Sequence, residues 1–233
     1  MSEGINPFEI EIGGYNKSTL NFIKKKNIKV YAELGCNHGN TAYKVAEVLP
    51  EGSEIYLFDF ETNIEIVIEK LKIFEGKLKI FYFPNSFKER DSYCWSLIEL
   101  IKKDSVTFDY VYIDGAHDLV IDGFAFFLCD RLLKDGGYID FDDYSWTFST
   151  SPTANPGNFP KVNEWYTQYQ LDTAQIKMFV DSVVKSHPKY EEIIKNKIFR
   201  KRYSNNQDIN LSSISTKGLL KILLNRFKRQ IIR

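Results

Sequence analysis

Short apolar runs and segments of helical periodicity alternate along the first two thirds of the chain. Apolar, aromatic and β-branched residues cluster at 28–34, 54–58, 78–83, 108–113 and 137–141. Between these runs, apolar residues recur at helical spacing over about 42–49, 64–74, 95–101 and 120–133. Strands that alternate with helices predict a parallel sheet with right-handed crossover connections. We therefore expect an α/β fold with a doubly wound, mostly parallel sheet.

The pattern changes on either side of this region. Residues 17–26 have the spacing of a short helix in front of the first strand. Ser149–Pro160 contains three prolines and a glycine, which predicts a surface loop, and we interpret about 147–172 as a substrate loop or lid. A plain connector is the alternative. Residues 175–185 predict one more helix, and the alternation of charged and apolar residues at 197–203 predicts an antiparallel edge strand.

Composition narrows the class of protein. The chain has 233 residues, enough for one domain with a real core, which we place at 1–204 with its central part at 28–146. Its formal net charge is zero, which argues against a general nucleic-acid binder. Cys36, Cys94 and Cys129 form no C-x-x-C pair, as is typical of reduced thiols, and no run has the length of a membrane span. We expect a cytoplasmic protein.

The last stretch, 205–233, has a different character. Apolar residues at helical spacing over 211–233 are surrounded by lysines and arginines, which predicts a basic amphipathic helix. Such a helix binds an anionic membrane, docks on a second copy of the chain or packs on its own domain. We therefore expect a homo-oligomer, or a location peripheral to the inner face of the membrane.

Acidic residues stand where two of the apolar runs end. Asp114 follows the run at 108–113, and Asp142 and Asp143 follow the run at 137–141, with His117 close behind the first. Ligands in open α/β sheets bind at the carboxyl ends of the strands. These four residues are therefore the first candidates for chemistry.

The first three strands also end in polar residues. Glu33 to Thr41 forms a strand-to-helix turn, in which Gly35 allows a tight turn and Gly39 a close approach of a ligand. The pattern is not the dinucleotide fingerprint, because its second glycine is missing, and a bare turn is the alternative. Asp59 ends the second strand, where it is placed to bind both hydroxyls of a ribose or to cap the next helix. Asn85 and Ser86 at the third strand end would line an adenine or form a turn.

Together these motifs resemble the class I S-adenosylmethionine-dependent methyltransferases over about residues 28–146. The resemblance is to the group with Ile-Asp-Gly-Ala-His after strand four and Asp-Asp-Tyr after strand five. It implies a Rossmann-like sheet and S-adenosyl-L-methionine as the cofactor. The residues that it implies for cofactor binding are Glu33, Gly35, Asn37, Gly39, Thr41, Asp59, Ser86 and Asp114.

The chain is also similar to metal-dependent sugar O-methyltransferases. That resemblance implies a divalent cation such as Mg²⁺ on Asp114, Asp142 and Asp143. The alternative is that Asp142 caps a turn and Asp143 supports a loop. The related enzymes carry a second acid after strand four, where this chain has Ala116. His117 then becomes the candidate base beside Asp114, because imidazole titrates near neutral pH. A structural role for the histidine is the alternative.

The resemblance implies methylation of a hydroxyl on a sugar or a sugar-linked acceptor, such as a nucleotide-sugar or glycan precursor in the synthesis of a bacterial surface glycan. Two other functions stay open. One is a metal-independent O- or N-methyltransferase acting on a small molecule or a phosphate-type acceptor. The other is a non-catalytic Rossmann-like binding module.

Overall fold

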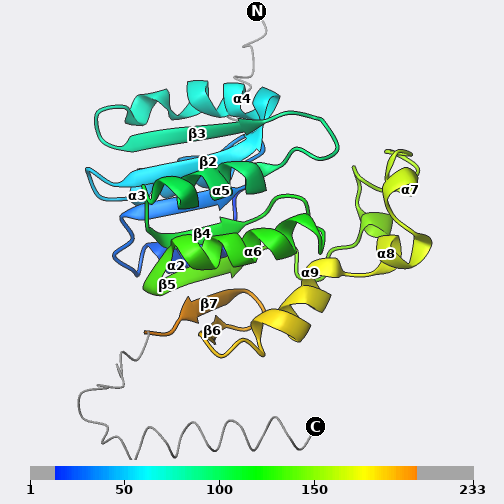
Figure 1. The fold of residues 1–233 in the computed structure, drawn as a ribbon. Helices are drawn as coiled ribbons and strands as arrows, with labels where there is room; N and C mark the ends of the chain where they lie inside the picture. Colours follow the sequence, from blue (N-terminus) through cyan, green and yellow to red (C-terminus); the bar gives the residue numbers. More distant parts are fainter. Residues whose placement is uncertain (1–13, 204–233) are drawn as a thin grey trace, which may run out of the picture. The chain divides into compact units, whose positions relative to one another are not determined.

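The computed structural model describes residues 14–203, which form a seven-stranded sheet with helices on both faces (Figure 1). The strands are β1 (Val30–Leu34), β2 (Glu54–Phe60), β3 (Lys79–Asn85), β4 (Phe108–Ile113), β5 (Leu133–Phe141), β6 (Tyr190–Ile194) and β7 (Ile198–Lys201). Their order in the sheet is β3-β2-β1-β4-β5-β7-β6. The first five are parallel, and β7 runs antiparallel to both β5 and β6. The predicted doubly wound, mostly parallel sheet is confirmed.

The helices follow the predicted alternation. They are α2 (Lys17–Ile23), α3 (Asn40–Val48), α4 (Glu61–Leu71), α5 (Tyr93–Lys103), α6 (Ile121–Leu132), α7 (Val162–Trp165), α8 (Gln168–Asp172) and α9 (Gln175–Phe179). Two short 3₁₀ turns, η1 (Lys72–Phe74) and η2 (Phe148–Thr150), follow α4 and precede α7. The helix expected at 175–185 changes character midway, because α9 continues as a π-helical turn, η3 (Val180–Val184).

Two hydrophobic cores lie on the two faces of the sheet. Tyr31 on β1 and Tyr110 on β4 point to the face covered by α2, α3 and α4. Their neighbours Ala32 and Val111 point to the opposite face, covered by α5, α6 and α9. Successive side chains of a strand alternate between faces, so a strand covered on both sides is apolar throughout. This is why the strands appear in the sequence as unbroken apolar runs.

The expected antiparallel pairing at this edge of the sheet is confirmed. Residues 197–203 do contain a strand, but β7 lies between β5 and β6, and β6 is the edge. Strand β6 was not predicted, because its sequence, Tyr-Glu-Glu-Ile-Ile, has no clear alternation. In β7, Ile198 and Phe199 are buried on opposite faces of the sheet, and the sequence pattern could not show that a further strand pairs with β7.

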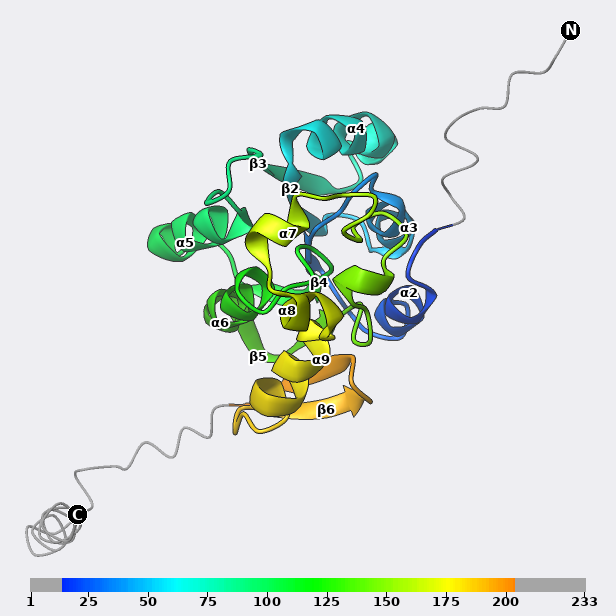
Figure 2. The ribbon, with the colours of Figure 1, turned by 90° about the vertical axis from the view of Figure 1, so that its right-hand side faces the viewer.

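Residues 147–172 form a small layer with its own core. Phe148, Val162 and Leu171 are its buried members, and Tyr166 ties it to the loop after β4 by donating a hydrogen bond to Asp118 (2.6 Å). In the view toward one end of the sheet, α7 and α8 lie in front of β4 (Figure 2). Across residues 14–203, none of the helices is both long and apolar enough to cross a membrane. The predicted tail at 205–233, with its helix at 211–233, lies outside the described residues.

Candidate functional site

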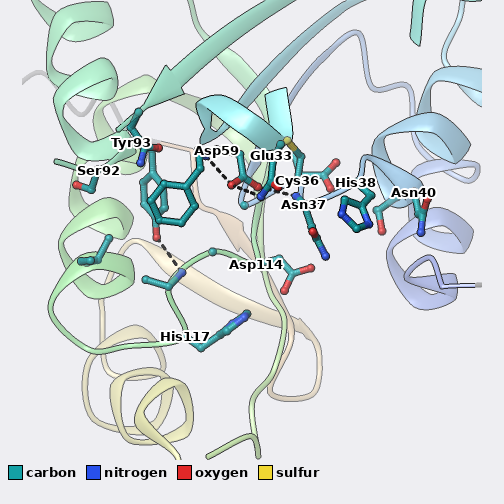
Figure 3. Close-up of a pocket in the computed structure, with 18 of the residues that line it drawn as sticks. Glu33, Cys36, Asn37, His38, Asn40, Asp59, Ser92, Tyr93, Asp114 and His117 are labelled. Atoms are coloured by element: carbon teal, nitrogen blue, oxygen red, sulfur yellow. Dashed lines mark hydrogen bonds between the residues drawn. The ribbon is translucent and has the colours of Figure 1, made fainter. Parts of the chain in front are cut away.

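A cavity of about 360 Å³ opens at the carboxyl ends of strands β1 to β4 (Figure 3). The strand order reverses between β1 and β4, which is where ligands bind in doubly wound sheets. Each of these four strand ends contributes a polar side chain to the wall: Glu33, Asp59, Asn85 and Asp114. The structure thus brings together the strand ends that the sequence singled out.

Glycine is required at one point of the β1–α3 loop. Gly35 has a φ of +83°, and a Cβ there would lie 2.3 Å from both the Asp114 carbonyl oxygen and the Gly115 Cα. The loop after β1 and the turn after β4 therefore pack backbone against backbone. Gly39, also at positive φ, begins α3, and its N–H donates to the Cys36 carbonyl (2.7 Å). Gly35, Cys36, Asn37 and His38 of this loop line the cavity, whereas Gly39 does not.

Asp59 fixes the far side of the same loop. Its Oδ2 accepts a hydrogen bond from the backbone N–H of Asn37 (2.6 Å), which has a φ of +45°. Its Oδ1 accepts from the Phe60 N–H (2.6 Å) and from the Asn63 amide (2.9 Å) at the start of α4. The carboxylate lines the cavity and helps to hold the start of α4, which is the expected capping role.

The third strand end differs from the expectation in detail. Asn85 lines the cavity and is only 8% exposed, and its Oδ1 has no hydrogen-bond partner among the described residues. Ser86 does not line the cavity. Its hydroxyl donates a hydrogen bond to Asp91 (2.7 Å), and Asp91 is part of the cavity wall. Thr41 is in the wall, and its hydroxyl oxygen accepts from the Asn16 N–H (3.1 Å).

Two residues that the sequence did not single out shape the turn after β4. Asp122 on α6 accepts hydrogen bonds from the backbone N–H of His117 (2.7 Å) and from the hydroxyl of Tyr93 on α5. His117 has a φ of +56°, so this buried carboxyl holds the histidine in a left-handed conformation. Burial raises the pKa of Asp122 to about 6. Its position in the first turn of α6, ahead of a long apolar stretch, was the one available signal.

The cavity wall carries excess negative charge. Burial raises the pKa of Glu33 to about 8, although a hydrogen bond from the Tyr31 hydroxyl (2.8 Å) acts in the opposite direction. The pKa of Asp114 is raised well above its usual range by burial and then by Asp142 and Asp143. Buried carboxyls that cannot all ionise favour a cationic ligand, because a positive charge stabilises the ionised forms.

The acids of β5 are partly neutralised by a lysine that the sequence analysis missed. Lys197, in the loop between β6 and β7, lies with its Nζ 3.0 Å from Asp140 Oδ1 and 3.4 Å from Asp142 Oδ1. Asp142 also accepts hydrogen bonds from the Tyr112 hydroxyl (2.5 Å) and the Asn16 amide (2.8 Å). Burial would raise the pKa of Asp142, but Lys197 and these hydrogen bonds lower it below the usual value. Asp140 is fully buried beside Lys197.

Asp143 turns the other way, toward His117. The His117 Nδ1 lies 3.1 Å from Asp143 Oδ2, and the ring packs on Trp146 with centroids 4.9 Å apart. Burial raises the pKa of Asp143, while His117 acts to lower it. One possible ligand atom from each of Asp114, His117 and Asp143 lies within 4.8 Å of the other two. The structure therefore groups these three residues and turns Asp142 toward Lys197.

Comparison with known proteins gives matches at the level of structure. No protein-family model matches the chain, and no curated protein matches its sequence. An O-methyltransferase from Bacillus cereus in complex with S-adenosylhomocysteine is similar with a TM-score of 0.56 and 12% identity, covering 87% of this chain and 84% of its own. A candidate O-methyltransferase from Klebsiella pneumoniae gives 0.54 and 12%, with 87% and 83% covered.

A third solved structure has the same fold. The S-adenosylhomocysteine-bound methyltransferase from Podospora anserina gives a TM-score of 0.50 at 16% identity, covering 86% of this chain and 83% of its own. Identities this low carry information about the fold and not about substrates. The chain therefore has the Rossmann-like fold of these methyltransferases.

Proposed function

We propose that this protein is an S-adenosyl-L-methionine-dependent O-methyltransferase. The observation that carries the proposal is the cavity at the switch point, to which each of four successive strand ends contributes a polar side chain. A bare βα turn would account for the two glycines, but not for Glu33, Asp59, Asn85 and Asp114 in one wall. The fold shared with O-methyltransferases supports the same function.

The chemistry of the wall suits the parts of this cofactor. S-adenosylmethionine supplies a methyl group on a positively charged sulfur. Glu33 offers a carboxylate to its cationic amino acid end, beside Asp114 in the same wall, and Asp59 offers carboxylate oxygens to the ribose hydroxyls. The buried, unpartnered Oδ1 of Asn85 offers an acceptor to an amino group such as that of adenine. Gly35, Asn37, Gly39 and Thr41 shape the loop between these groups, and Ser86 supports the wall through Asp91.

Proton removal from the acceptor is proposed at the cluster of Asp114, His117 and Asp143. Without a metal, the 3.1 Å contact to Asp143 orients the His117 ring and leaves Nε2 to accept the proton. The remaining contribution of the protein is to place the acceptor oxygen in line with the methyl group. Residues 147–172 are proposed as the substrate lid, since Trp146 and Tyr166 connect this layer to the turn after β4.

The proposed acceptor is a hydroxyl of a sugar or of a glycan precursor, on the resemblance to sugar O-methyltransferases. A divalent cation such as Mg²⁺ would orient vicinal oxygens of such an acceptor. We further propose a cytoplasmic homo-oligomer with no nucleic-acid partner, and a membrane or self-association role for 211–233. A metal-independent transferase for small-molecule or phosphate-type acceptors is the competing enzyme, and a binding module without catalysis is the competing class.

Calorimetry with S-adenosylhomocysteine tests the proposal. We expect the wild-type chain to bind one equivalent, and Asp59→Ala to weaken binding by roughly 10–100-fold, because charge-assisted hydrogen bonds to the ribose are lost. Glu61→Ala is the matched control, since this exposed acid lies two residues away and outside the wall. Thermal unfolding of each variant verifies that it is folded. An absence of binding by the wild-type protein would refute the function.

A further inference from the structure

The ligand set expected for a metal does not fit the side chains at the strand ends. Asp142 already accepts two short hydrogen bonds, from the Tyr112 hydroxyl (2.5 Å) and the Asn16 amide (2.8 Å). Its other oxygen faces the Lys197 ammonium at 3.4 Å. A fixed ammonium repels a second cation on the same carboxylate. Asp142 is therefore the ion-pair partner of Lys197 and not a metal ligand. The expected ligand set of Asp114, Asp142 and Asp143 does not fit the structure.

Three other donors converge nearby. Asp114 after β4, His117 in the following turn and Asp143 after β5 each offer one atom, all within 4.8 Å of one another. Asp114 and His117 also line the cavity, so further coordination positions would face a bound acceptor.

The surroundings hold these donors in place. The Tyr112 hydroxyl donates to Asp114 (3.0 Å), and Asp122 fixes the backbone of His117 through its N–H (2.7 Å). Trp146 packs on the imidazole ring. Partners that orient the ligands in this way are a regular feature of metal sites in proteins. Among the described residues, Lys197 forms ion pairs with Asp140 and Asp142 and none with Asp114 or Asp143.

We propose that Asp114, His117 and Asp143 bind one divalent transition-metal ion through two carboxylates and the imidazole Nδ1. Carboxylates alone suit Mg²⁺ or Ca²⁺, whereas a nitrogen ligand favours ions such as Mn²⁺, Co²⁺ or Zn²⁺. The inference deepens the proposed function, because the ion would replace the free His117 base in activating the acceptor. Ion binding is nevertheless measurable without turnover.

Electron paramagnetic resonance and calorimetry with Mn²⁺ on the full chain test the proposal. We expect one ion per chain, bound at least tenfold more tightly than Mg²⁺, with a nitrogen coupling in the pulsed spectrum from the imidazole. His117→Ala should remove the coupling, and both His117→Ala and Asp143→Ala should weaken binding at least tenfold. His187→Ala, a histidine that packs against Phe126, is the matched control and should change neither.

Asp142→Asn separates the two ligand sets. On our proposal this variant keeps Mn²⁺ affinity within about threefold and keeps the nitrogen coupling. Loss of binding in Asp142→Asn with full binding in His117→Ala would overturn the proposal, as would an absence of Mn²⁺, Co²⁺ and Zn²⁺ binding. Binding of S-adenosylhomocysteine, measured on the same samples, reports failure of the proposed function separately.

Discussion

Replacing Glu33 by Gln should remove a pH dependence from cofactor binding. Glu33 lies in the cavity wall with 1% of its surface exposed, and burial raises its pKa to about 8. At pH 6 to 7 the carboxyl of the ligand-free protein is therefore mostly protonated. A ligand with an ammonium group interacts best with the carboxylate, so binding at these pH values must release the proton.

The size of the effect follows from the pKa. Ionising a carboxyl of pKa about 8 at pH 6 costs about 2.7 kcal/mol, since each pH unit corresponds to about 1.4 kcal/mol. The affinity for S-adenosylhomocysteine should therefore rise with pH, by roughly 50-fold between pH 6 and 8, and level off as pH 8 is passed. Gln cannot ionise, so this part of the dependence disappears in Glu33→Gln.

Calorimetry at pH 6, 7 and 8, in buffers that differ in ionisation enthalpy, measures both affinity and proton release. Asp114 also lies in the wall with a raised pKa, so the informative quantity is the difference between the two proteins. Wild type should release about one more proton than Glu33→Gln at pH 6. Equal proton release by both proteins, or a wild-type affinity that falls as pH rises, would refute this reasoning.

Two further predictions concern packing and charge. Gly35→Ala should cost more stability than Gly52→Ala and should alone impair S-adenosylhomocysteine binding. Both glycines have a positive φ, which costs about 1–2 kcal/mol for a residue with a side chain. Only at Gly35 would the added Cβ also clash with backbone, 2.3 Å from the Asp114 carbonyl oxygen. Lys197→Met should lower the free energy of unfolding in urea by about 3–5 kcal/mol, because it leaves the buried Asp140 carboxylate without its counter-ion. A loss below 1 kcal/mol would mean that the pair is not a major stabilising contact.

The central sheet could be predicted because its information is local. Strands β1, β2 and β4 are buried on both faces and therefore appear as continuous apolar runs, and the intervening helices have clear periodicity. The edge could not be predicted in the same way. Whether β7 pairs with one strand or two depends on β6, whose polar sequence carries little pattern.

The candidate site shows the same division. Parallel strands deliver their carboxyl ends to one side of the sheet, so Glu33, Asp59 and Asp114 could be placed together from the sequence. The sequence could not show that Lys197, 55 residues after Asp142, pairs with Asp142, or that Asp143 contacts His117 instead. It could not show either that Asp122 holds the turn containing His117. Contacts of this kind depend on three-dimensional packing.

A crystal structure with S-adenosylhomocysteine bound tests the central claim most directly. The account predicts density in the cavity at the ends of β1 to β4, with the ribose hydroxyls on Asp59 and an adenine nitrogen within hydrogen-bond distance of Asn85. The amino acid end should lie near Glu33 and Asp114. Density at another place on the protein, or a cavity filled only by solvent at saturating ligand, would contradict the account.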